Sequence, residues 1–461
     1  MSETFTDLHV GKPPTSQSTT HHIAMILVAA TLVAAAAALA PPAKVDVAIA
    51  GGGLGGLAAC AALRARGVDA HVFEAAGELL RGSTGTGIMI SANGMAALGA
   101  VDRRLPAAMR ARGVRITAQH ITKYAADGEV ELRRTSDATT FRDAFGHDQY
   151  NIAWSAAHAA LAAVVPPENV HCGRAVAGAT AADGGVDVAF ADGSSVRCGL
   201  LVGADGIGSR VRELVAPGAD APRYSGQLLW NAIVDSEALP LHGPGEVSFA
   251  TTGLDGRAIL AFDAGSGKTS WYLTLPLDAA PRSAAAIAAG SFGGFGGDGL
   301  DDLRASFAGF PDALACLAAT PPGDVFARRL GDRPPLRSWT ALGGRVVLLG
   351  DAAHPMVPSQ GQGTMVTWED AADLAALVAT RSVPAATKAF ARRRRGRCAM
   401  VQRYSAAAYM GRPSPARNPR KFLRLLGNFR RIKQMYAGYA PLDELPGEPF
   451  EKWAWSGPVF N

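Results

Sequence analysis

Residues 44–74, KVDVAIAGGGLGGLAACAALRARGVDAHVFE, decide the fold of this chain. The apolar run 45–49 predicts a short buried parallel strand, and residues 54–66 predict the helix that follows it. Residues 69–73 predict a second strand, which ends at Glu74. This succession is typical of a βαβ unit that binds a dinucleotide, whereas a glycine-rich loop alone would be a weak signal.

Three glycines follow the first strand in the spacing G-x-G-x-x-G, namely Gly51, Gly53 and Gly56. The first permits a tight turn, the second lets a pyrophosphate approach the backbone, and the third lets the helix pack on the strand. The phosphates would lie at the helix N-terminus, and Glu74 would accept hydrogen bonds from ribose hydroxyls. The pattern leaves open whether the dinucleotide is NAD or FAD, and a purely structural βαβ unit is the alternative.

The composition is that of a folded protein with room for two or three domains. The chain has 461 residues, of which 48% are hydrophobic and 18% are charged, so it is not a disordered polypeptide. Its five cysteines form no C-x-x-C pair, which argues against a zinc site and against a disulfide framework. We therefore predict no metal site.

Positive charge is concentrated towards the C-terminus. Residues 381–433 contain sixteen Lys or Arg and no Asp or Glu, so the rest of the chain carries a net negative charge. The runs 392–395 and 419–435 are the most basic, and the apolar residues of the second fall near one face of a helix. The interpretations are a solvated helix that caps the domain, docking on anionic lipid, or contact with nucleic acid; we predict no nucleic-acid partner.

The first forty residues are interpreted as an address or an anchor. Residues 1–22 are polar, and residues 23–40 form an uncharged apolar run at the lower edge of the ~17–25 residues that span a bilayer. The run ends in an A-x-A-like signal, Ala38-Leu39-Ala40, but the region before it is not strongly basic. A cleaved targeting segment, a retained membrane anchor and a surface helix therefore stay open. In each of the first two cases the protein would be membrane-associated or directed to an organelle.

Two later segments again place a glycine turn between an apolar strand and a helix, over 200–212 and 345–363. Between them, residues 224–280 alternate in the manner of strands and predict an antiparallel sheet inserted between pieces of the nucleotide domain. The turn residues are Asp205, Gly206 and Arg212 in the first segment, and Gly350, Asp351, Gly361, Gln362 and Gly363 in the second.

Two local signals make further expectations about secondary structure. Asn93 is predicted to cap a helix around residues 96–98. The turn at 191–193, Ala-Asp-Gly, is predicted to join the strands 186–190 and 196–198 in a hairpin.

The three glycine turns, in this order and spacing, resemble those of the flavoprotein monooxygenases of the aromatic-hydroxylase type, over about residues 44–405. The resemblance implies that the dinucleotide is FAD and that NADH or NADPH reduces it without a second Rossmann unit. It further implies that O2 forms a C4a-hydroperoxide on the flavin, from which one oxygen atom passes to the substrate. The cofactor supplies the chemistry, so neither a catalytic triad nor a metal is needed.

The same resemblance assigns the cofactor site. Asp351 would bind the ribitol hydroxyls, and the helix that Gly361 and Gly363 open would stabilise negative charge on the reduced flavin. Pro355 and Pro358 would stiffen the loop beside the isoalloxazine ring, whereas His354 is interpreted as a structural hydrogen-bonder. The predicted cofactor-binding residues are Gly51, Gly53, Gly56, Glu74, Arg81, Asp205, Gly206, Arg212, Gly350, Asp351, Gly361, Gln362 and Gly363.

A finer resemblance is to zeaxanthin epoxidases, through Arg81-Gly82 and the segments 263–272 and 328–337. It implies a carotenoid or another lipophilic substrate and, with the apolar leader, a plastid. One departure from the family concerns the segment YNIAWSAAHAAL, where Trp154 occupies the position of an arginine that commonly contacts the cofactor.

We predict an α/β protein: a Rossmann-type FAD-binding domain with an inserted antiparallel β-sheet substrate domain and a helical C-terminal tail. Its predicted function is FAD-dependent monooxygenation, which hydroxylates or epoxidises a small aromatic or lipophilic substrate. The alternatives are an oxidase, dehydrogenase or halogenase on this fold, or a membrane-tethered flavin-binding protein with little turnover. The predicted parts are 1–43 (targeting or anchor), 44–215 (FAD-binding, first part), 216–340 (substrate domain), 341–385 (FAD-binding, returning part) and 386–461 (basic helical region).

Overall fold

The computed structural model describes residues 44–79, 86–125, 127–218, 221–239, 243–252, 256–279, 298–409, 435–436 and 439–442. The predictions made for residues 1–43, for Arg81 and for most of 419–435 therefore lie outside the described residues. Among the helices of the described ranges, none combines the length and the apolar character needed to cross a bilayer.

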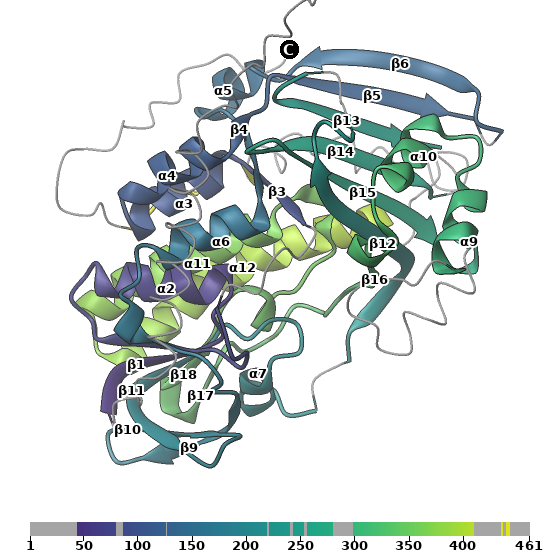
Figure 1. The fold of residues 1–461 in the computed structure, drawn as a ribbon. Helices are drawn as coiled ribbons and strands as arrows, with labels where there is room; N and C mark the ends of the chain where they lie inside the picture. The colour runs from purple at the N-terminus through teal and green to yellow at the C-terminus, as the bar shows by residue number, and fades with distance from the viewer. Residues whose placement is uncertain are drawn as a thin grey trace, which may run out of the picture.

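An eight-stranded sheet forms the centre of the first half of the molecule (Figure 1). Its path is β17-β18-β11-β1-β2-β8, and β10 and β9 extend it from β11. The four central pairings, from β18 across to β8, are parallel, which fits their fully buried apolar residues. The strands are β1 (Lys44–Ala50), β2 (Ala70–Phe73), β8 (Val170–His171), β9 (Val176–Ala182), β10 (Gly185–Phe190), β11 (Ser195–Gly203), β17 (Thr340–Ala341) and β18 (Val346–Leu348).

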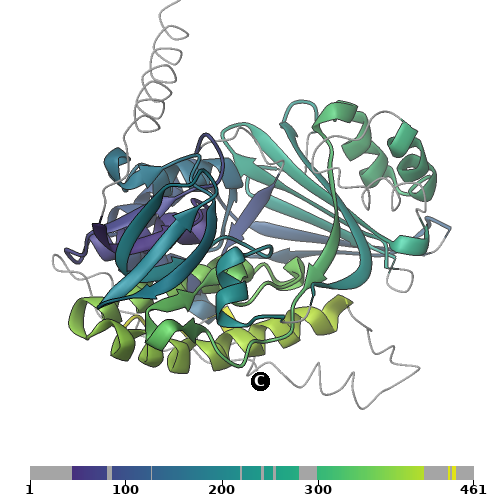
Figure 2. The same cartoon turned by 90° about the horizontal axis from the view of Figure 1, so that it is seen from below.

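Helices surround this sheet and carry the largest hydrophobic core. Figure 1 shows α2 and α11 side by side over the sheet, and Figure 2 shows α12 running along the same body from end to end. The helices are α2 (Leu54–Arg64), α3 (Ala92–Val101), α4 (Arg104–Arg112), α6 (Trp154–Ala162), α7 (Arg210–Val215), α11 (Gly363–Thr380) and α12 (Val383–Tyr409).

A seven-stranded sheet, in the order β16-β12-β15-β14-β13-β5-β6, forms the second half. Helices α9 (Asp298–Ser306) and α10 (Pro311–Ala318) cover one face, where Leu303, Phe307 and Phe310 pack with Trp230 and Trp271. The strands are β5 (Ala118–Tyr124), β6 (Val130–Asp137), β12 (Arg223–Asp235), β13 (Glu246–Thr251), β14 (Ala258–Gly265), β15 (Lys268–Pro276) and β16 (Phe326–Asp332).

A small three-stranded sheet, β3-β7-β4, connects the two halves. It consists of β3 (Gly87–Ile90), β4 (Val114–Arg115) and β7 (Tyr150–Ala153), and α5 (Thr140–Phe145) precedes β7. Short 3-10 turns complete the fold at Pro167–Asn169, Leu277–Ala279, Pro322–Asp324, Leu342–Gly344, Gly350–Ala352 (η5) and Pro358–Gln360 (η6).

The predicted α/β class and the first βαβ unit are confirmed, since β1, α2 and β2 occupy the expected positions. The hairpin at 191–193 is also confirmed, although its second strand continues unbroken through β11. The prediction for Asn93 is wrong: it lies inside α3, whose N-cap is Ser91. A short-range capping rule failed because the Asn93 side chain is used in contacts with α11 instead.

The inserted sheet is larger than residues 224–280 and is not wholly antiparallel. It also takes in β5 and β6, which lie within 44–215, and β13 pairs with β5 in parallel. These strands come from residues 118–137, more than eighty residues before residue 224, which alternation within one segment cannot reveal. Likewise, α12 begins at Val383 and runs across the position 385/386 at which the tail was predicted to start.

Candidate active site

The glycine turn after β1 has the geometry that a pyrophosphate requires. Gly51 has a φ of +101°, and a Cβ there would lie 2.6 Å from the carbonyl oxygen of Ala204. A Cβ on Gly56 would lie 1.9 Å from the carbonyl oxygen of Gly51, so the helix can approach the turn only through a glycine. Gly53, in contrast, has no atom within 4 Å of a Cβ position, which leaves space for a ligand at the N-terminus of α2.

Glu74 lies at the end of β2, next to this turn. Its carboxylate accepts hydrogen bonds from the backbone N–H of Gly52 (2.7 Å) and of Ala76 (2.9 Å). Each carboxylate oxygen can accept more than one hydrogen bond, so these contacts orient Glu74 and leave it able to accept from a ribose hydroxyl. The residues present therefore fit the adenosine end of FAD.

Asp205 and Arg212 act within the protein. Ser209 is the N-cap of α7, and the Asp205 carboxylate supports it, accepting from the Ser209 hydroxyl at 2.5 Å and from the Arg210 backbone N–H at 2.7 Å. Arg212 is buried and donates to the carbonyls of Ala352 (2.9 Å) and Ala353 (3.1 Å). Asp205 is predicted as a cofactor contact, and in the structure both of its carboxylate oxygens bond to groups at the start of α7. Arg212 thus joins this segment to the third glycine turn, which follows β18. Gly206 has a φ of +78° in the bend before α7.

Asp351 is placed to meet a ligand. It follows β18 in η5, its side chain is exposed, and it has no hydrogen-bond partner among the described residues. Gly350 before it has a φ of +58°, and its N–H donates to Asp370 at 3.1 Å. An unpartnered carboxylate at the carboxyl end of a central parallel strand fits a hydroxyl-rich ligand such as the ribitol chain.

The N-terminus of α11 presents uncapped N–H groups. The helix begins at Gly363, and its N-cap, Gln362, makes no side-chain capping bond. Instead the Gln362 side chain points inward, accepting from Asn93 at 2.9 Å and donating to Ser91 at 2.8 Å. Gly361, with a φ of +62°, has no atom within 4 Å of a Cβ position. This bare helix end can stabilise negative charge on a flavin ring placed against it.

The loop between these two turns is anchored at one end and exposed at the other. Pro355 is buried, and its carbonyl accepts from the Gln402 side chain of α12 at 3.2 Å. Pro358 is exposed and begins η6. Between them Val357 packs with Leu229 and Leu330 of the seven-stranded sheet. The loop therefore lies against the sheet face opposite α9 and α10.

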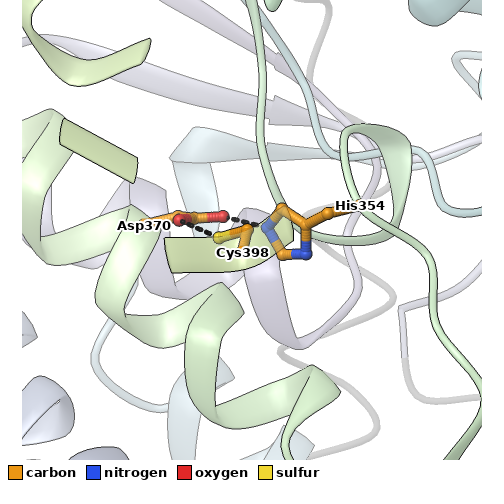
Figure 3. Close-up of side chains that lie close together, drawn as sticks. All are labelled: His354, Asp370 and Cys398. Carbon is orange, nitrogen blue, oxygen red and sulfur yellow. Dashed lines mark hydrogen bonds and ion pairs between the residues drawn. The ribbon is translucent and has the colours of Figure 1, made fainter. Parts of the chain in front are cut away.

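His354, Asp370 and Cys398 form a fully buried cluster beneath the loop (Figure 3). The Nε2 atom of His354 lies 2.5 Å from Asp370 Oδ2, and the Cys398 thiol lies 3.7 Å from Asp370 Oδ1. Although burial disfavours the imidazolium, Cys398 and Asp370 hold the pKa of His354 well above its ordinary value. His354 is thus a charged anchor that holds the loop on α11, in line with the structural interpretation.

The ligand atoms of these three residues lie within 4.8 Å of one another, which suits a metal ion by distance alone. However, Arg394 donates to Asp370 Oδ1 at 2.7 Å and lies 3.8 Å from the Cys398 sulfur. A guanidinium at this position already neutralises the carboxylate and would repel a cation. We therefore interpret the cluster as an internal ion network.

Three arginines of α12 enter this network. Arg394 also pairs with Glu369 (2.6 Å), Arg397 pairs with Glu369 (2.6 Å), and Arg393 pairs with Asp373 (2.7 Å). Much of the basic run 392–395 is therefore matched by carboxylates of α11. This accounts for part of the local charge without an external partner.

The sheet face opposite α9 and α10 carries a polar group that the sequence analysis missed. Arg328 of β16 donates to Asn231 Oδ1 of β12 (2.7 Å) and to the Thr86 hydroxyl (3.2 Å). Beside them, the Tyr272 hydroxyl donates to the carbonyl of Gly87 at 2.5 Å. These residues come from four separate segments and form no motif, so only the fold brings them together.

Trp154 begins α6 and stacks on His158, with ring centroids 4.6 Å apart. His158 in turn lies 2.7 Å from the carbonyl oxygen of Gly52 in the glycine turn. Trp154 therefore supports the turn through His158 and brings no positive charge to it.

The comparisons with known proteins agree with this geometry. Residues 44–278 and 337–398 match the family model described as "FAD binding domain". The chain is 31% identical to 3-amino-4-hydroxybenzoate 2-monooxygenase from Streptomyces cremeus over 331 residues, which is 72% of this chain and 77% of that protein. It is 31% identical to 3-hydroxybenzoate 6-hydroxylase 1 from Aquipseudomonas alcaligenes, over 79% of this chain and 88% of that protein.

The fold is also that of solved flavoproteins. The structure of Klebsiella pneumoniae HpxO complexed with FAD and uric acid superposes with a TM-score of 0.68 and 24% identity, over 85% of this chain and 94% of that one. The family match gives FAD as the cofactor, and the glycine turns, Asp351 and the α11 N-terminus described above have the chemistry to hold it. The chain belongs to the FAD-dependent monooxygenases of the aromatic-hydroxylase type, oxidoreductases that use NAD(P)H and O2 to hydroxylate small aromatic substrates.

Proposed function

We propose that the substrate is a small aromatic ring that carries an anionic group, such as a carboxylate, and that Arg328 binds this group. We call residues 353–362, between η5 and α11, the flavin loop. The observation that carries the proposal is the position of Arg328 on the sheet face that meets this loop. Arg328 pairs with Leu229 across β12 and β16, and Leu229 contacts Val357 of that loop. A ligand held by Arg328 would therefore lie beside the flavin loop.

The charge of Arg328 is not matched by a carboxylate of the residues that the structure describes. Among the described residues no carboxylate lies within ion-pairing distance of its guanidinium, and its contacts are to the neutral groups of Asn231 and Thr86. Burial lowers the pKa of Arg328, which reflects the cost of keeping this charge away from water. An anionic substrate would offset that cost, and the guanidinium fork suits a planar carboxylate.

Tyr272 completes this polar group. Burial raises the pKa of its phenol, so the hydroxyl stays protonated at neutral pH. It accepts from the Gly87 backbone N–H at 2.7 Å and donates to the carbonyl of the same residue, which fixes the start of β3 beside Thr86. Tyr272 thus positions the segment that carries one of the Arg328 partners.

The names of similar proteins support the same substrate class. Relatives act on 3-amino-4-hydroxybenzoate, on 3-hydroxybenzoate and on 6-hydroxynicotinate, each of which bears a carboxylate on a small ring. For the present chain this remains an inference from Arg328.

The test uses the FAD-loaded protein with a panel of hydroxybenzoates, aminobenzoates and hydroxynicotinates, with their neutral amides, and with zeaxanthin as a lipophilic substrate. NAD(P)H oxidation and incorporation of labelled oxygen are measured. We expect label in the product of an aromatic acid and little turnover of its amide. Preferred turnover of zeaxanthin or of a neutral ring would overturn the proposal.

Variants of Arg328 test whether this residue binds the acidic group of the substrate. Arg328→Gln should weaken binding of the acid by about 10²-fold, because a charge-assisted hydrogen bond contributes ~1.5–3 kcal/mol. FAD content should be unchanged. Arg329→Gln is the matched control, since Arg329 is the next residue of β16 and stacks over Tyr224 instead. Equal losses in both variants would contradict a specific role for Arg328.

From the sequence alone we also infer that residues 1–40 direct or anchor the protein, and that 23–40 or 419–435 contact a membrane surface. The support is the apolar run at 23–40 and the basic, one-sided pattern at 419–435. Flotation with liposomes should carry the full chain upward and leave residues 44–461 without the second segment behind. Equal behaviour of both would remove this inference.

A further inference from the structure

A basic pocket lies outside the site described above, between α4, α5 and the start of β7. It has a volume of about 280 Å³ and is lined by Arg110, Arg142, His147, Asp148 and Tyr150. Figure 1 shows α4 and α5 on the same side of the molecule, next to β4. Nothing in the site described above uses these residues.

The pocket has more positive than negative charge. Asp148 is its one carboxylate, and it is approached by Arg142 at 3.5 Å and by Arg115 of β4 at 3.7 Å. Both distances exceed those of a close hydrogen-bonded ion pair, and Arg110 has no ion-pair partner among the described residues. Three guanidinium groups around one carboxylate leave a net positive charge, which favours an anionic ligand.

Tyr150 adds a neutral hydrogen-bond donor. Burial and the charge of Asp148 raise the pKa of its phenol, while Arg110, Arg115 and Arg142 act in the opposite direction. All four charged groups therefore lie close enough to act on one hydroxyl. Guanidinium forks together with a protonated hydroxyl are the donors that bind phosphate oxygens.

Two connections place the pocket near the flavin. Tyr150 begins β7, and Ala153 at the other end of that strand pairs with Gly87, the neighbour of Thr86. A strand rises ~3.3 Å per residue, so Tyr150 lies roughly 10 Å along β7 from the residue that pairs with Gly87.

The second connection runs through Tyr436. Phe141 and Phe145 of α5 contact the Tyr436 ring, and the Tyr436 hydroxyl donates to the Gln360 carbonyl of η6 at 3.1 Å. The helix that carries Arg142 is thus linked to the flavin loop itself.

We propose that this pocket binds a phosphate group of the nicotinamide cosubstrate and holds the dinucleotide while its nicotinamide reaches the flavin. The inference rests on the use of NAD(P)H as reductant, which follows from the family assignment above. It does not depend on which aromatic ring is hydroxylated. The pocket gives the chain an anchor for the cosubstrate without a second Rossmann unit.

The first experiment follows flavin reduction under anaerobic conditions in the FAD-loaded full chain, with NADPH and NADH varied separately. Arg110→Gln and Arg142→Gln should each raise the half-saturating nucleotide concentration on the order of tenfold, since each removes a charge-assisted contact. The reduction rate at saturation and the FAD content should be unchanged. Arg112→Gln is the matched control, because Arg112 is exposed on the same helix and bonds to the Ala108 carbonyl.

The second experiment measures binding directly by calorimetry with 2′,5′-ADP, ADP and inorganic phosphate. Binding of a nucleotide that Arg110→Gln weakens and Arg112→Gln does not would support the proposal. Binding of inorganic phosphate without any effect of the variants on nucleotide affinity would assign the pocket to free anions and overturn it. Unchanged half-saturation in both pocket variants would overturn it as well. Neither readout requires hydroxylation, so failure of the aromatic-acid proposal would be seen separately.

Discussion

Arginines in two regions of this protein meet opposite surroundings. On α12, Arg393, Arg394 and Arg397 each reach a buried carboxylate of α11 at 2.6 to 2.7 Å. On the substrate side, Arg328 has only neutral partners, and Arg110 has no ion-pair partner among the described residues. The positive charges of the α12 arginines are paired with carboxylates of the protein, whereas those of Arg328 and Arg110 are not paired with a carboxylate of the described residues. The difference indicates that the α12 arginines hold the fold together, and it is the basis for proposing Arg328 and Arg110 as ligand-binding residues.

The balance also explains why charge counted along the sequence misleads. The run 392–395 is strongly basic, but two of its four arginines, Arg393 and Arg394, pair with carboxylates of the neighbouring helix α11. Arg328, within an unremarkable strand, has the more informative surroundings. A charged side chain without an ion-pair partner, rather than a high density of charge along the sequence, identifies a candidate ligand-binding site.

Disrupting the ion network between α11 and α12 should have the largest effect on stability. Arg394→Met leaves Glu369 and Asp370 buried without this partner and should lower the free energy of unfolding by about 3–5 kcal/mol. Chemical denaturation of the purified protein measures the loss. Arg395→Met, at the next and exposed position of α12, is the control and should change little. Similar values for both variants would contradict the structural role of the network.

The pH dependence of stability should report His354. Its folded pKa is raised above the unfolded value of about 6.5, so its contribution is fully present below that pH and is lost as the pH rises through the folded pKa. The wild-type free energy of unfolding should fall above pH ~6.5, by at most ~1.4 kcal/mol per unit. His354→Asn should show a flatter profile over the same range. Parallel profiles for the two proteins would exclude a charged His354.

Arg328→Met should act in the opposite direction from Arg394→Met. It removes an unmatched charge from a half-buried face, so the ligand-free protein should gain about 1 kcal/mol in stability while losing affinity for an aromatic acid. Denaturation without substrate, followed by substrate titration, measures both quantities. A destabilisation comparable to that of Arg394→Met would show that Arg328, like the α12 arginines, stabilises the fold.

Exposed ion pairs should contribute least to the free energy of unfolding. Lys268 and Asp235 lie 2.5 Å apart, but both side chains are largely open to solvent. Lys268→Ala should change the free energy of unfolding by no more than ~0.5 kcal/mol, because solvent screens the pair. The same denaturation assay provides the value, and a loss above 1 kcal/mol would mean that proximity alone stabilises this fold.

Sequence reasoning succeeded where the determinants are local. The turn around Gly51 requires particular residues within a few positions of one another, and the three glycines have the surroundings that their spacing predicts. The aromatic-hydroxylase family followed from the order of three such turns. The βαβ unit and the α/β class could therefore be read from the chain directly.

It failed where a residue is defined by distant partners. Asn93 resembles a helix cap, but its amide is committed to Gln362, 269 residues further along the chain. Asp205 is predicted from its turn as a cofactor contact, and only the positions of Ser209 and Arg210 show that its carboxylate bonds to the start of α7. Arg328 carries no local signal, because alternation within β16 does not reveal which face meets the flavin loop.

The interleaving of the two sheets has a consequence for biosynthesis. β1 pairs with β11, β5 with β13, and β11 with β18. The seven-stranded sheet therefore lacks β16 until the chain has been made past Asp332, and the eight-stranded sheet lacks β18 until it has been made past Leu348. The nascent polypeptide carries unpaired strand edges for most of its synthesis, a state that exposes it to aggregation. Long-range pairing of this kind also slows folding. Truncation before β18 should therefore leave an insoluble fragment rather than a smaller domain, and folding in the cell is expected to be late and to depend on chaperones.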